Sequence, residues 1–134
     1  MKVGISLILS ILLAQVTPQK NDPKGIWKAE TGTKFELQPS DYGVDVHLVP
    51  GSNPRYLKYE LQLKKTDEVN TYEGAGYFVA KLQNGKECRF DAEWQIVVVQ
   101  PALIAAIVPN IVPDPETCAV KRAIRRSLNS KKSS

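Results

Sequence analysis

The feature that most limits what this chain can fold into is a strict alternation of polar and apolar residues between positions 87 and 96. A period of two places one set of side chains on each face of a β-strand, so this segment predicts a strand with one buried and one exposed face. The apolar set includes Phe90 and Trp94, and the other set is mainly charged. One-sided burial of this kind is typical of antiparallel sheets.

The same period recurs in shorter segments along most of the chain. Turn residues separate these segments, among them Asn84-Gly85, a dipeptide that type I′ hairpins prefer. Residues 102–108 form an apolar run that fits either a buried strand or a helical turn, and the prolines that follow it predict a break. The expected strands cover residues 25–30, 34–38, 44–48, 57–64, 71–82, 88–98, 102–108 and 117–121.

About eight short strands with short connections and little helical pattern predict one all-β domain. Short connections favour antiparallel pairing of successive strands and hence a single small barrel, with a two-sheet sandwich as the alternative. Gly74 and Gly76, in the expected strand 71–82, indicate a bend or a close approach of a neighbouring strand.

The first residues have the pattern of a secretory signal peptide. Lys2 supplies a positive charge, and the almost purely apolar residues 3–14 form a run too short for a bilayer, which needs about 20 apolar residues. A core helix is the alternative. We predict a signal peptide over residues 1–18, a barrel domain over 19–120, and a secreted or periplasmic protein.

The two cysteines, Cys88 and Cys118, both lie in the expected mature domain. In an oxidising compartment an even pair favours a disulfide, and two cysteines with one histidine are too few for a structural zinc site. Closing a loop of this length stabilises the fold by roughly 3 to 4 kcal/mol in the chain-entropy model. We predict a Cys88–Cys118 bond.

The charges are unevenly distributed along the chain. All 14 acidic residues lie between Asp22 and Glu116, whereas the segment after Cys118 carries six basic residues and no acidic one. We predict a flexible basic tail over residues 121–134, with an apolar stripe if it becomes helical. The residues predicted to bind an anionic surface are Lys121, Arg122, Arg125 and Arg126; a merely solvated end is the alternative.

The start of the expected domain resembles that of calycin barrels, the lipocalin and avidin group. The pattern Gly25-x-Trp27, followed by Gly32 and Phe35, is similar to the first hairpin of avidin-like proteins. The resemblance implies an eight-stranded barrel that can hold one small ligand. Ala29 stands where avidin-like proteins supply an amide to their ligand, so we do not predict biotin binding.

Four aromatic residues on the expected inner faces are candidates for contact with such a ligand. They are Trp27, Phe78, Phe90 and Trp94. Packing in the core is the alternative for all four, and for Trp27 this means closing the base of the barrel.

No set of residues in the sequence predicts catalysis. His47, the single histidine, lies on the polar face of an expected strand, and both cysteines are assigned to a disulfide. Asp91 and Glu93 share a face with Arg89, which indicates cross-strand pairing instead of an acid–base pair. We predict no catalytic residue, no metal site and no cofactor.

We therefore expect a secreted, monomeric, non-enzymatic protein that holds a small or partly apolar molecule in its barrel. The alternative is a protein-binding module or inhibitor that uses the loops at one barrel end, and a small secreted hydrolase ranks third. Nucleic acid is not an expected partner of an exported chain.

Overall fold

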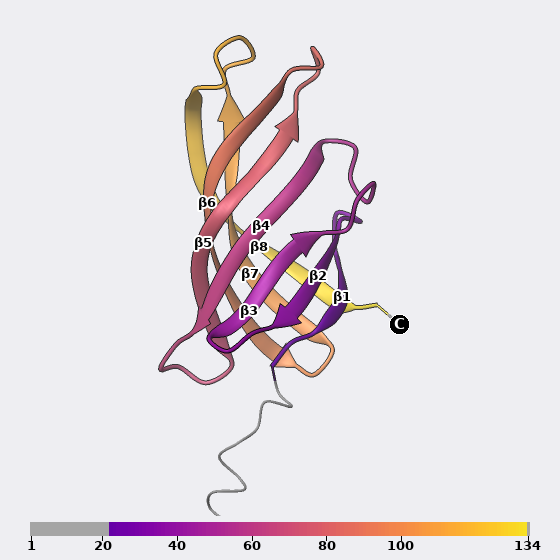
Figure 1. Cartoon of the computed structure of the whole chain (residues 1–134), viewed down its shortest axis with the longest axis vertical. Helices are drawn as coiled ribbons and strands as arrows, with labels where there is room; N and C mark the ends of the chain where they lie inside the picture. The colour runs from indigo at the N-terminus through magenta and orange to yellow at the C-terminus, as the bar shows by residue number, and fades with distance from the viewer. Residues whose placement is uncertain (1–21, 134) are drawn as a thin grey trace, which may run out of the picture.

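The computed structural model describes residues 22–133, which form one closed barrel of eight strands (Figure 1). Each strand pairs antiparallel with the next along the chain, and β8 pairs with β1 to close the barrel. The predicted all-β antiparallel barrel is confirmed, and the sandwich alternative is wrong. The strands are β1 (Gly25–Ala29), β2 (Lys34–Pro39), β3 (Gly43–Leu48), β4 (Tyr56–Lys65), β5 (Thr71–Lys81), β6 (Glu87–Gln100), β7 (Leu103–Pro113) and β8 (Val120–Lys132).

The alternation of apolar and polar residues in β6 determines which side chains of this strand face the barrel interior. Phe90, Ala92 and Trp94 are buried, and the residues between them are exposed. Aromatic and aliphatic side chains from every strand complete the core. No helix among the described residues is long and apolar enough to cross a membrane. The predicted signal peptide, residues 1–18, lies outside the described residues.

Two glycines in β5 allow the backbone of β4 to come unusually close. A Cβ atom on Gly76 would lie 1.9 Å from the Glu60 carbonyl oxygen, and one on Gly74 would lie 2.0 Å from that of Gln62. Any side chain at these positions would therefore displace the neighbouring strand. This is the close approach that the two glycines predicted.

The C-terminal third of the chain differs from the prediction. β7 continues through Pro109 to Pro113, where it pairs only with β8. Its other edge has no partner strand there, so proline, which lacks an N–H donor, is tolerated at that edge. The segment expected as a flexible basic tail is instead β8, which extends from Val120 to Lys132. The segment 117–121, expected as the last strand, is the end of a turn and the start of β8.

The two ends of the barrel differ. The closed end holds Trp27, whose indole N–H donates to the Lys24 carbonyl, and Asp22, which accepts from the Tyr72 hydroxyl and lies 3.4 Å from the Lys65 ammonium. At the open end the β5–β6 and β7–β8 hairpins extend beyond β1, β2 and β3 (Figure 1). One pocket lies at this open end, and a second one, of about 330 Å³, lies at the closed end beside Trp27.

Candidate ligand pocket at the open end of the barrel

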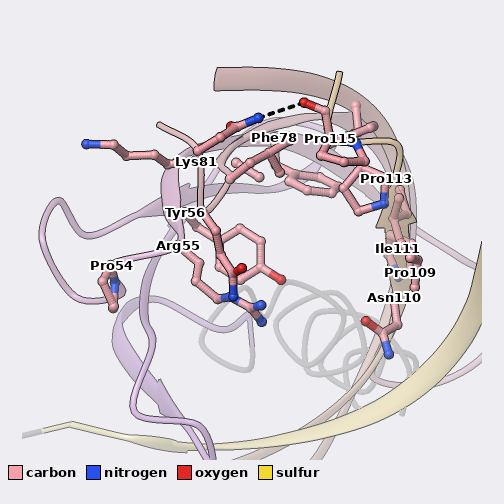
Figure 2. A pocket seen from close by; sticks show the side chains of 16 residues that line it. Pro54, Arg55, Tyr56, Phe78, Lys81, Pro109, Asn110, Ile111, Pro113 and Pro115 are labelled. Carbon is pink, nitrogen blue, oxygen red and sulfur yellow. Dashed lines mark hydrogen bonds between the residues drawn. The ribbon is translucent and has the colours of Figure 1, made fainter. Parts of the chain in front are cut away.

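The open end contains a pocket of about 840 Å³ (Figure 2). Its volume falls in the range of roughly 300 to 1,000 Å³ that is usual for small-molecule sites. The β5–β6 hairpin, the start of β4 and the end of β7 surround it. The lining residues used below are Arg55, Tyr56, Phe78, Ala80, Lys81, Phe90, Pro109, Asn110, Ile111, Val112 and Pro113.

An incomplete ladder creates this space. The β6–β7 pairing ends at Gln95 and Ile107, so beyond that point β6 pairs only with β5 and β7 only with β8. Pro109 and Pro113 have no N–H to donate, which disfavours continued pairing of β7 with β6. The two hairpins therefore remain apart over the length of the pocket.

Three contacts hold the tips of these hairpins together. Cys88 of β6 is bonded to Cys118 of the β7–β8 turn, which confirms the predicted disulfide. The Asn84 side-chain amide donates to the Pro115 carbonyl at 2.9 Å, the dashed line in Figure 2, and the Lys86 ammonium donates to the Glu116 carbonyl. The pocket is thus bounded below by the barrel core and above by these contacts.

Aromatic rings form the inner surface of the pocket. Phe78 and Phe90 face each other across the β5–β6 ladder with ring centroids 5.4 Å apart, and both line the pocket. Tyr59 stacks on Phe78 at 5.1 Å, and Tyr56 contacts Phe78 edge-on at 5.8 Å. Burial raises the pKa of Tyr59 far above its ordinary value, with a smaller contribution from Tyr56, so its phenol stays neutral.

Trp94 lies behind the inner surface of the pocket and is separated from it by the ring of Tyr59. It contacts Tyr59 at 5.6 Å and Phe35 at 5.1 Å, and it does not line the pocket itself. Its indole N–H is buried and has no hydrogen-bond partner among the described residues. Trp27, the other tryptophan predicted to contact ligand, is buried at the closed end, where it lines the second pocket. The four predicted residues are thus divided: Phe78 and Phe90 line the pocket, Trp94 lies behind it, and Trp27 is remote.

The mouth of the pocket is polar. Figure 2 shows the Arg55 and Tyr56 side chains directed toward the middle of the opening, with Asn110 on the opposite side and Lys81 directed away. None of the described residues that line the pocket is acidic.

The residues at the mouth were not predicted from the sequence. Residues 50–54 have the composition of a loop, and the alternation in β4 placed Leu57 inward. A register shift between Tyr56 and Lys58 exchanges the faces at this point, so Leu57 is 42% exposed and Tyr56 is turned inward. Asn110 lies beyond the proline at which we expected the strand to end.

The basic residues predicted to bind an anionic surface lie on β8. Lys121, Arg122, Arg125 and Arg126 are all exposed, and none has a carboxylate within ion-pair distance among residues 22–133. Arg122 and Arg125 pair across the ladder with Val112 and Pro109 of the pocket lining.

The polar groups considered for catalysis lie elsewhere. His47 is on the outside of β3, with its imidazole 3.8 Å from the Glu60 carboxylate. Asp91 and Glu93 are exposed on the outer face of β6, opposite Tyr77 and Ala75. Residues 22–133 contain no group of three or more histidine, cysteine or acidic side chains that could hold a metal ion.

Comparison with known proteins found no matching family model, no significantly similar curated protein and no significantly similar solved structure. The fold and the pocket therefore define a class at the coarse level: a closed eight-stranded antiparallel barrel with a disulfide-bridged open end.

Proposed function

We propose that this protein is an exported, non-enzymatic carrier that holds a small, partly apolar molecule in the open end of its barrel, in the manner of calycin proteins. The observation that carries the proposal is the pocket between the β5–β6 and β7–β8 hairpins, with Phe78 and Phe90 at its inner surface. An aromatic surface beside a few polar groups is the usual lining of a small-molecule site.

Export is part of the same proposal. The apolar N-terminal sequence and the Cys88–Cys118 bond both fit a secreted or periplasmic protein, since disulfides persist in oxidising compartments. N-terminal sequencing of the protein recovered outside the cytoplasm tests this part, and a mature start close to residue 19 is expected.

Titration of the mature protein with a panel of fatty acids, retinoids and haem, followed by tryptophan fluorescence, tests the ligand site. Saturable quenching by at least one class supports the carrier. Flat titrations, together with native mass spectra of the exported protein that show a bound protein and no small molecule, would favour the alternative of a protein-binding module.

A second candidate function rests on β8. Its four exposed basic residues, Lys121, Arg122, Arg125 and Arg126, lack carboxylate partners among the described residues, and such charge attracts anionic lipid surfaces by about 1 kcal/mol per residue. The carrier would then exchange its ligand at a membrane. Co-sedimentation with anionic vesicles tests this candidate.

A further inference from the structure

We propose that the ligand is an anionic amphiphile whose head group is bound by Arg55 at the pocket mouth, with Arg122 and Arg126 of β8 contributing further positive charge. This inference rests on the proposed function, and it adds a chemical class to the ligand: an apolar chain that ends in a carboxylate or a phosphate.

The composition of the pocket gives the first argument. The described part of the chain contains all 14 acidic residues, yet none of them lines the pocket, whereas Arg55 and Lys81 do. A concave site with one sign of charge concentrates ligands of the opposite sign. A neutral ligand would gain no electrostatic attraction from this positive charge, and a cationic ligand would be repelled by it.

The position of Arg55 gives the second argument. Its backbone is fixed on both sides, because its N–H donates to the Asn53 side chain at 2.8 Å and its carbonyl accepts from the Lys81 N–H at 2.7 Å. Its guanidinium has no carboxylate partner among residues 22–133. In Figure 2 it points into the opening beside the Tyr56 hydroxyl. A guanidinium can bind a carboxylate or phosphate through two parallel hydrogen bonds.

The neighbouring donors fit the same ligand. Tyr56 has a hydroxyl and Asn110 has a side-chain amide, and the two lie on opposite sides of the mouth. Both groups can donate to an anionic oxygen. The apolar chain would then pass inward, toward Phe78 and Phe90.

The alternation of β8 gives the third argument. Leu128 and Ser130 are buried, so the period of two places Arg126, Ile124 and Arg122 on the same, inward face of the strand. Their partners on β7 are Val108, Asn110 and Val112, and the last two line the pocket. Both arginines are exposed and neither lines the pocket, so they add positive charge beside its opening without forming its wall.

Four ligands of equal chain length, titrated by calorimetry, test the inference: dodecanoate, dodecyl phosphate, dodecanol and dodecylammonium. The charged ligands are kept below their micelle concentrations and dodecanol below its solubility limit. We expect the wild-type protein to bind the two anions about tenfold more tightly than dodecanol, and dodecylammonium most weakly, since a hydrogen bond between two charged groups is stronger than one to a neutral hydroxyl. R55Q should lose most of this preference and keep its affinity for dodecanol. R122Q/R126Q should weaken the binding of both anions severalfold.

R89Q is the matched control, because Arg89 is exposed on the outer face of β6 and does not line the pocket, and because its replacement removes the same charge; this variant should match the wild type. Melting temperatures of all variants check that each is folded. Equal affinity for the four ligands would overturn the anionic head group and leave the carrier function standing. A preference for anions that persists in R55Q would overturn the assignment to Arg55. Binding of none of the four would contradict the carrier function itself.

Discussion

Cys88, near the start of β6, is bonded to Cys118 in the β7–β8 turn, and this bond spans the opening that the β6–β7 ladder leaves beyond Gln95 and Ile107. It is a covalent link between two hairpins that share no backbone ladder at that level. The disulfide therefore has two roles, because it restricts the unfolded chain and it fixes the width of the pocket.

Replacing both cysteines, C88A/C118A, should lower the free energy of unfolding by roughly 3 to 4 kcal/mol, the value for closing a loop of this length. Urea unfolding followed by circular dichroism measures this loss, and wild-type protein kept in a reductant should behave in the same way. The folded variant should also bind ligand more weakly than the wild type. An unchanged urea midpoint would show that the hairpins hold their positions without the bond.

The two tryptophans should report differently on ligand. Trp94 is separated from the pocket by the single ring of Tyr59, whereas Trp27 lies at the closed end with its N–H bonded to Lys24. We expect W27F to keep the ligand-induced fluorescence change and W94F to lose most of it. The reverse result would place the ligand at the closed end of the barrel.

The buried phenols predict loss of stability at high pH. Burial raises the pKa of Tyr59 and of Tyr72 above the ordinary value of 10.0, and Asp22 adds to the shift of Tyr72. Their contribution to stability is complete below about pH 10 and declines as the pH rises further, because only the unfolded chain can release these protons readily. One such tyrosine accounts for about 1.4 kcal/mol per pH unit above 10.

Urea unfolding at pH 8 and at pH 11 measures this effect. Y59F should lose about 1.4 kcal/mol less than the wild type between the two values, whatever its stability at pH 8. Equal losses in the two proteins would mean that Tyr59 ionises in the folded state.

Binding to an anionic membrane would depend on β8 as a folded strand. Arg125 lies on the outer face of β8, opposite Pro109, and Lys121 is the extra residue at the register shift near the end of the ladder. K121Q/R125Q should reduce co-sedimentation with anionic vesicles at low salt, and high salt should abolish it for the wild type. K28Q/K34Q, at a pair of the β1–β2 ladder, is a control of equal charge change. Equal loss in both double variants would indicate attraction by net charge alone.

Much of the fold follows from one pattern in the sequence. The period of two identifies β2 to β6 because each has a buried and an exposed face, as the alternating burial of β6 shows. β8 could not be recognised in this way, because nearly all its residues before Leu128 are exposed on both faces. Six of the 13 residues of β8 are basic, and the exposed part before Leu128 is a strand only because it pairs with β7.

The candidate site was predictable in part. Phe78 and Phe90 belong to the regular strands β5 and β6, so their inward direction follows from the alternation. Arg55 and Tyr56 do not, since a register shift determines which way they face. Trp27 faces inward as expected, but a barrel has two ends, and a strand pattern does not show at which end an inward residue lies.

The most direct test of whether the open end is a ligand site is to measure ligand binding after a bulky side chain has been placed in the pocket. Ala80 lines the pocket between Tyr56 and Cys88 on the neighbouring strands, and it is buried. A80F places a ring in the space that the ligand would occupy, whereas A75F places the same ring on the outer face of β5. Calorimetry with dodecanoate should show tight binding to the wild type and to A75F and at least a tenfold weaker affinity for A80F, with all three proteins folded. Undiminished binding to A80F would contradict a ligand site at the open end.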